Sequence, residues 1–293
     1  MPPYRGKLIN LIFKFNYPAR GRGYIEDMAL KSFHATSLKS AALRAGLKIR
    51  FERGRLITEP LVPPPPLVEG CRADDSDFCL WVTDGSHRAG GHPILTEEQM
   101  KRAAKRYRLG KSRSGKTIFW MIDEMDRVHD GHIGDSWVSV MLKAREPKLL
   151  RDWYAEHCLF GLHLLYFNAN PNVNANLNAN HNCQLSMVCV VERETSAVIL
   201  SELFPEYIWM ATCTPMNLML DRLEPLRSCQ VTLFPSTDMT MGTFLWWQEV
   251  AEEARQKRHL NITVSSVLED CATEEQKRRK IDLVDFLVEE WKV

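Results

Sequence analysis

Short apolar runs and helix-like segments alternate regularly in the C-terminal part of this chain. Residues 187–191 are five consecutive apolar residues rich in Val, the pattern of a strand buried on both faces. Further apolar runs, each expected to form a strand, occur at residues 207–210, 230–234 and 262–267. Segments with helical patterns follow them at residues 195–203, 217–223, 243–257 and 283–291. Strands separated by helices predict βαβ units, and therefore a parallel sheet with flanking helices.

The preceding region has a different pattern and predicts a smaller α+β unit. Residues 96–109 predict a basic helix that begins with a T-x-x-Q capping box. Residues 117–122 are branched and aromatic, as in a strand. Residues 146–165 predict an amphipathic helix with Phe160 among its core residues. The fold class that we expect is therefore α/β in the C-terminal part, preceded by a smaller basic α+β region.

Proline and asparagine runs divide the chain. Four consecutive prolines at residues 63–66 predict a stiff extended spacer. An Asn-rich repeat cannot pack a core and predicts a surface loop. The expected segments are a basic N-terminal region (1–62), a Pro-rich linker and loop (63–95), a basic helix and β-rich region (96–166), the Asn-rich loop (167–182) and the C-terminal domain (183–293).

Positive charge is concentrated in two places, although the net charge of the chain is only +1. Residues 1–60 hold 12 Lys and Arg against 4 acidic residues, and residues 101–116 hold 8 Lys and Arg with no acidic residue. Such density favours contacts with nucleic-acid phosphates, and a solvated helix face is the alternative. The predicted nucleic-acid-binding residues are Lys101, Arg102, Lys105, Arg106, Arg108, Lys111, Arg113 and Lys116.

Two motif-like patterns lack the context that their chemistry needs. Residues 110–117 match G-x4-G-K-T, but a P-loop needs a strand before the loop and a helix after it, and here the expected order is reversed. Cys71, Cys79, His87 and His92 lack the short Cys-x2–4-Cys arm of structural zinc sites. We therefore expect neither a nucleotide P-loop nor a zinc site.

The cysteine pattern and the hydropathy indicate the cellular compartment that we expect for this protein. The eight cysteines include no C-x-x-C pair, which favours a reducing compartment over a disulfide framework. No secretory signal is visible, and no apolar run approaches the roughly 18 residues of a membrane span. The expectation is a cytoplasmic protein without membrane contact.

A series of short motifs carries a family resemblance. Residues 191–197 read VERETSA, residues 209–212 WMAT, residues 231–235 VTLFP, residues 272–275 ATEE and residues 281–287 IDLVDFL. In this order they resemble the V-E-S-E-K-T-A, W-L-A-T, V-x-L-F-P, A-T-x-E and D-I-A-D-F-L motifs of Toprim-like domains in primase-related proteins of Bacteroidota and their mobile elements. The resemblance covers about residues 96–291.

This resemblance implies a small parallel sheet between helices and a phosphoryl-transfer site. The family's acid after the first strand corresponds to Glu192, a general acid/base near a divalent metal, and its Mg²⁺-binding D-x-D corresponds to residues 236–238. Ser236 replaces the first carboxylate, so that only Asp238 matches, and Thr195 replaces the family's Lys. Glu192, Ser236 and Asp238 are therefore the predicted metal-site residues, with Mg²⁺ as the implied cofactor and with a weakened or lost site expected.

Three functions fit these observations. The favoured one is a nucleic-acid-binding Toprim-like protein of the DNA replication or mobilisation class. Its partners would be DNA or RNA, together with proteins of a replication or mobilisation complex. The second is an active Mg-dependent primase- or nuclease-type enzyme with Glu192 as the catalytic residue. The third is a structural or interaction protein that does not bind nucleic acid.

Overall fold

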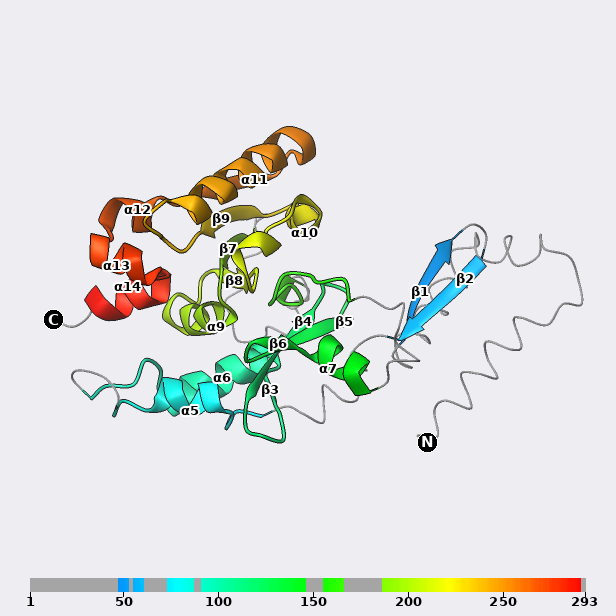
Figure 1. Ribbon diagram of the computed structural model, residues 1–293, viewed down its shortest axis with the longest axis horizontal. Coiled ribbons are helices and arrows are strands. Elements are labelled where there is room, and N and C mark those ends of the chain that lie inside the picture. The colour runs from blue at the N-terminus through cyan, green and yellow to red at the C-terminus, as the bar shows by residue number, and fades with distance from the viewer. Residues whose placement is uncertain are drawn as a thin grey trace, which may run out of the picture.

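The structure is a computed structural model, and it describes residues 47–52, 55–60, 73–86, 91–145, 155–165 and 186–290 (Figure 1). The Asn-rich loop predicted at residues 167–182 lies outside the described residues, as does most of the N-terminal region. In that region the structure describes β1 (Leu47–Glu52) and β2 (Arg55–Pro60), which pair as an antiparallel hairpin.

A four-stranded parallel sheet forms the centre of the C-terminal part. Its strands are ordered β10-β9-β7-β8, and every neighbouring pair is parallel. The central strand β7 is buried from its second residue onward, as its continuous apolar run predicts. This sheet confirms the predicted α/β fold class. The strands are β7 (Met187–Val191), β8 (Ile208–Ala211), β9 (Gln230–Phe234) and β10 (Asn261–Val264).

Helices cover both faces of this sheet, with α11 on one side and α9 on the other (Figure 1). The second half of α9 is apolar on most sides because it is buried between the sheet and two further helices, α6 and α14. The helices of this part are α9 (Glu194–Leu203), η1 (Pro215–Asn217), α10 (Leu220–Leu223), η2 (Glu224–Leu226), α11 (Gly242–Arg258), α12 (Val267–Cys271), α13 (Glu274–Arg279) and α14 (Leu283–Glu290).

A second, antiparallel sheet precedes the parallel one in sequence, with strand order β3-β4-β5-β6. All six residues of β4 are buried, and α7 packs against β5 and β6. The G-x4-G-K-T segment forms the turn between β3 and β4, so no helix follows its lysine. The elements are β3 (Gly110–Lys111), β4 (Thr117–Ile122), β5 (Val128–Ile133), β6 (Ser136–Trp137) and α7 (Val138–Arg145).

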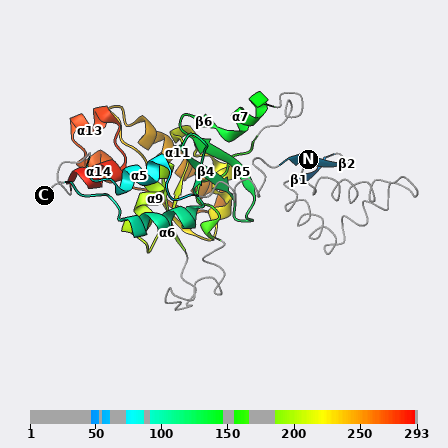
Figure 2. The ribbon, with the colours of Figure 1, turned by 90° about the horizontal axis from the view of Figure 1, so that it is seen from below.

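The helix α6 packs on α9, and α5 packs on α6 and on β4 (Figure 2). The predicted capping box is present at the start of α6 (Glu97–Tyr107). The other helix, α5 (Asp77–Thr83), lies in a segment that the sequence predicted to be linker and loop. That expectation was wrong for α5, because the side chains of Phe78, Cys79 and Val82 are buried in the main core. Cys71 and His87 of the discounted zinc pattern lie outside the described residues.

Residues 155–165 join the two sheets. Residues 155–163 of the predicted amphipathic helix at 146–165 are not helical, and within the described part only Leu164 and Leu165 are. Phe160 instead pairs with Ala211 of β8 through two backbone hydrogen bonds of 2.9 and 3.0 Å, and His163 N–H donates to Ile122 O of β4 at 3.1 Å. Gly161 has φ +85°, which suits glycine and interrupts any helix. The backbone of this segment therefore connects β4 to β8.

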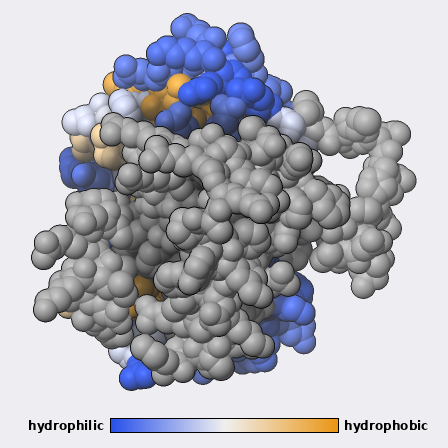
Figure 3. All heavy atoms as spheres, turned by 90° about the vertical axis from the view of Figure 1, so that its right-hand side faces the viewer, coloured by the Kyte–Doolittle hydropathy of each residue, from blue (hydrophilic) through white to orange (hydrophobic). Residues whose placement is uncertain are grey.

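The surface is of the mixed kind expected for a globular protein. On the face shown in Figure 3, hydrophobic residues form small groups among hydrophilic ones. None of the helices in the described residues combines the length and the apolar character that crossing a membrane requires.

Candidate functional site

Three neighbouring strands of the parallel sheet end at the same edge, and polar residues follow each of them. Glu192 follows β7, Thr212 follows β8, and Ser236 lies two residues after β9. Thr212 N–H donates to Val191 O at 3.1 Å, and Cys213 N–H donates to Glu192 O at 2.8 Å. Ligand sites of parallel α/β sheets lie at this carboxyl edge, so it is the candidate site.

The surroundings of Glu192 favour its protonated form. Its side chain is half-buried, and burial raises the pKa of the carboxyl above its ordinary value. The nearby Ser236 hydroxyl and the Arg193 cation oppose this rise, whereas Asp282 adds to it. A raised carboxyl pKa is the property that general acid/base chemistry requires, and this is the role predicted for Glu192.

Asp238 caps the N-terminus of α11. Its Oδ1 accepts hydrogen bonds from Thr240 N at 2.8 Å, Thr240 Oγ1 at 2.5 Å and Gly242 N at 3.2 Å, and its Oδ2 accepts one from Thr243 N at 3.2 Å. Burial by itself would raise the pKa of Asp238, but these hydrogen bonds outweigh it and lower the pKa to about 2. Both oxygens of this predicted metal ligand are therefore engaged by the start of the helix.

Replacing Asp238 by alanine should lower the free energy of unfolding by about 1 kcal/mol near neutral pH, because the first turn of α11 loses its acceptor. The pKa of Asp238 is lowered on folding, so this stabilisation is present above the ordinary pKa of 3.8 and is lost as the pH falls toward about 2. Urea unfolding across this pH range measures the difference. Asp238→Asn keeps one acceptor oxygen and should lose less. A difference that does not shrink in acid would contradict the capping role.

The donors at this edge do not fit a magnesium site. Mg²⁺ prefers near-octahedral oxygen ligands that include carboxylates. Ser236 supplies a neutral hydroxyl, and both oxygens of Asp238 are hydrogen-bonded to α11. Among the residues that the structure describes, no group of three or more His, Cys, Asp and Glu side chains is arranged to hold a metal ion.

Three buried hydroxyl groups at this edge lack a hydrogen-bond partner. Thr212, Ser236 and Thr237 are at least 95% buried, and their hydroxyl oxygens have no hydrogen-bond partner within the described part of the chain. Ser236 is near enough to Glu192 to lower its pKa, although the two side chains do not form a hydrogen bond of normal geometry. Unsatisfied buried hydroxyls are costly, so these three groups lower the stability of this edge.

Most of the predicted nucleic-acid-binding residues are ion-paired within the protein. Arg102 and Arg106 both bind the buried carboxylate of Glu202 at the end of α9, at 2.8 and 3.2 Å. These two arginines therefore hold α6 against α9. Three further pairs are Arg108 with Asp126, Lys111 with Asp75 at 2.6 Å and Lys101 with Glu97 at 4.0 Å.

Three of the eight predicted residues form no ion pair with a described side chain, and all three are exposed: Lys105, Arg113 and Lys116. The ammonium group of Lys116 lies over the turn between β5 and β6, since a Cβ on Gly134 would be 3.2 Å from Lys116 Nζ. The structure therefore leaves a smaller cationic surface than the eight residues of the sequence suggested.

A histidine–glutamate pair beside the edge was missed by the sequence analysis. His132 Nδ1 of β5 lies 2.6 Å from Oε1 of Glu194, the first residue of α9. The Glu194 side chain is 6% exposed, and that of His132 is 22% exposed. The two residues are 62 positions apart, and a single histidine in a strand has no spacing pattern that would identify it.

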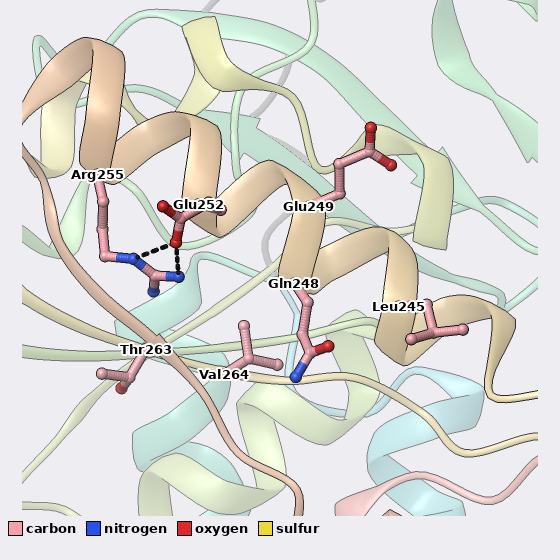
Figure 4. Close-up of a pocket in the computed structure, with 7 residues that line it drawn as sticks. All are labelled: Leu245, Gln248, Glu249, Glu252, Arg255, Thr263 and Val264. Atoms are coloured by element: carbon pink, nitrogen blue, oxygen red, sulfur yellow. Dashed lines mark hydrogen bonds and ion pairs between the residues drawn. The ribbon is translucent and has the colours of Figure 1, made fainter.

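A separate groove lies between α11 and the edge strand β10. It has a cavity volume of about 590 Å³ and contains none of the predicted site residues. Figure 4 shows the guanidinium of Arg255 donating hydrogen bonds to the carboxylate of Glu252, and both residues belong to α11 on one side of the groove. Arg255 also donates to Ile262 O at 2.8 Å, which occupies a carbonyl of the edge strand. The groove is lined by polar side chains as well as by Leu245 and Val264, but it contains no predicted site residue, so the carboxyl edge stays the candidate site.

In a comparison with known families, residues 92–237 match the family model described as Domain of unknown function (DUF6371). The DUF6371 match covers just under half of the chain. It includes Glu192, Glu194, His132 and Ser236, and it ends one residue before Asp238.

Among solved structures, the chain is similar to the primase fragment of the bacteriophage T7 primase-helicase protein. That likeness has a TM-score of 0.33 and 13% sequence identity, and it covers 61% of this chain and 70% of the primase fragment. A likeness this distant assigns neither a residue nor an activity to this chain. No curated protein matches the sequence.

Proposed function

We propose that this protein binds nucleic acid through a Toprim-like domain whose metal site is weakened or lost. The observation that carries this proposal is that neither Ser236 nor Asp238, the first and last residues of the D-x-D position, offers a free carboxylate. Ser236 offers a buried hydroxyl, and the carboxylate of Asp238 caps α11. A site with one free carboxylate, Glu192, holds Mg²⁺ poorly, because hard oxygen donors must replace part of its hydration shell.

The cationic surface supports the nucleic-acid part of the proposal. Lys105 and Arg113 are exposed and form no ion pair with another described residue, so their charges are available to phosphates. This surface does not distinguish DNA from RNA. Protein partners from a replication or mobilisation complex, and an origin in mobile elements of Bacteroidota, stay predictions.

A second candidate function is Mg-dependent phosphoryl transfer of the primase or nuclease type. One observation favours it: Glu192 lies at the carboxyl end of β7, and burial raises the pKa of its carboxyl, as general acid/base chemistry requires. Under this alternative, Glu192 is the catalytic residue and a partner or the nucleic acid itself completes the metal site.

Calorimetric titration with Mn²⁺ and Mg²⁺ separates these two functions. The titrations use the wild-type chain and Glu192→Gln, with a short single strand present. We expect strand binding in both proteins and a saturable metal signal in neither. Glu249→Gln, an exposed change on α11, is the matched control for the loss of one carboxylate. Saturable metal binding that Glu192→Gln alone removes would establish the catalytic alternative.

A further inference from the structure

The His132–Glu194 contact fixes how the histidine ring carries its protons. Glu194 Oε1 is a carboxylate oxygen and accepts the hydrogen bond, so Nδ1 of His132 is the donor at 2.6 Å. The neutral ring has one N–H proton, and the hydrogen bond to Glu194 keeps it on Nδ1. Nε2 therefore carries a proton only when the ring is cationic. Nε2 has no hydrogen-bond partner within the described residues, and the ring is partly exposed.

Aromatic packing holds the ring in place. The indole of Trp137 in β6 lies between two imidazoles, with ring centroids 4.6 Å from His132 and 4.1 Å from His157. His157 Nε2 in turn lies 3.0 Å from Oδ2 of the buried Asp130. The His132 ring is therefore oriented by a carboxylate through Nδ1 and by an aromatic ring on one face, which is the arrangement of a positioned acid/base group.

The charged groups around His132 favour its cation. Its hydrogen bond to Glu194 raises the pKa of the imidazole, burial opposes this rise, and the charges of Glu194, Asp135 and Asp130 raise the pKa further. Cys213 faces Glu194 from the end of β8, and burial raises the pKa of its thiol, so it adds no negative charge. The Lys116 ammonium lies over the turn that follows His132.

We propose that the His132 imidazolium, positioned by Glu194, binds a phosphate oxygen of a nucleic-acid backbone through its Nε2–H at the junction of the two sheets. This deepens the proposed function and rests on it. Two cations, His132 and Lys116, lie by the β5–β6 turn together with the exposed carboxylate of Asp135, and the two cations are the groups that would bind an anionic phosphate oxygen. The contact depends on protonation, since a neutral ring presents a lone pair at Nε2 and cannot donate a hydrogen bond there.

Fluorescence anisotropy with a labelled single-stranded DNA tests the proposal, at fixed ionic strength because affinity depends on salt. The affinity of the wild type should fall by about tenfold as the pH rises through the pKa of His132, which one charge-assisted hydrogen bond accounts for. His132→Gln should remove this fall. In Glu194→Gln the fall should begin at lower pH, because the charge that favours the imidazolium is gone.

The matched control is His259→Asn at the end of α11. His259 has φ +56°, a conformation that Asn also adopts, so the change leaves the backbone unstrained. This variant should lose affinity with pH as the wild type does. A fall in His132→Gln that parallels the wild type, or the absence of any fall in the wild type, would overturn the proposal.

A measurement on the unmodified chain keeps the test independent of variant folding and of the proposed function. Proton NMR follows the His132 imidazole, assigned by its loss in His132→Gln, in a pH titration with and without pyrophosphate. Pyrophosphate should raise the pKa of His132. If the wild type does not bind DNA, the proposed function fails, and a raised pKa would still support the phosphate site. An unchanged pKa would overturn it.

Discussion

Reversing Lys105 and Arg113 to glutamate should weaken binding to single-stranded nucleic acid by about tenfold and flatten the slope of log affinity against log salt by about 0.7 for each lost phosphate contact. Both side chains are exposed, and neither forms an ion pair within the part of the chain that the structure describes. Their reversal therefore leaves intact the pairs that hold α6, above all those of Arg102 and Arg106 with Glu202. The loss should be similar for all sequences, because phosphate contacts carry no base information.

Salt titrations of affinity by anisotropy measure this effect. The matched control is the double reversal of Arg227 and Arg278, two exposed arginines outside residues 101–116 whose pairs are short-range within their own segments. It changes the net charge of the chain by the same amount. If both double variants lose the same affinity, binding follows net charge alone, and the surface around α6 is not the interface.

Replacing Gly131 by alanine should lower the free energy of unfolding by about 1–3 kcal/mol, the range for overpacking a tight core. Gly131 of β5 pairs with Trp120 of β4, and the indole lies over it. A Cβ on Gly131 would lie 2.5 Å from Cε3 of Trp120 and 2.6 Å from its Cζ3. Gly110 of β3 meets the other part of the same ring, with a Cβ distance of 2.6 Å to Trp120 Nε1. The indole of Trp120 is therefore in close contact with both glycines, Gly110 and Gly131.

Urea unfolding measures the cost, and a double-mutant cycle assigns it to the ring. In a Trp120→Leu background the Gly131→Ala change should cost clearly less, because the atoms that clash are absent. Gly242→Ala at the start of α11 is the control for glycine replacement itself. Its nearest contact would be the flexible Thr240 hydroxyl at 3.3 Å. Equal costs for Gly131→Ala in the two backgrounds would place the strain elsewhere.

Local patterns in the sequence were sufficient for the elements themselves. The boundaries of β4, β7 and β9 are those predicted from their apolar runs, and the capping box at the start of α6 is formed as expected. Each of these signals lies within a few residues of the element that it specifies. The alternation of strands and helices then predicted the parallel sheet, because parallel neighbours need crossover connections.

Local patterns were insufficient where a long-range partner decides the outcome. Residues 155–165 have an amphipathic pattern, yet Phe160 pairs with Ala211, and a strand partner satisfies its backbone as well as a helix would. Asp238 matches a metal-ligand position in the family resemblance, but its oxygens bind backbone amides up to five residues ahead. A one-dimensional motif does not reveal whether a carboxylate is free or committed.

The sequence alone thus determined the α/β class, the strand order along the chain and the position of Glu192 at the end of a buried strand, because burial periodicity is a local property. The tertiary structure alone decided which charges are free. Arg102 lies 100 residues from Glu202, and His132 lies 62 residues from Glu194. These residues, distant in sequence, come into contact only when α6 packs on α9 and when β5 lies against the start of α9. Which cations and which imidazole are available to a phosphate is therefore set by packing, since an ion pair forms only between groups that the fold brings within a few ångströms.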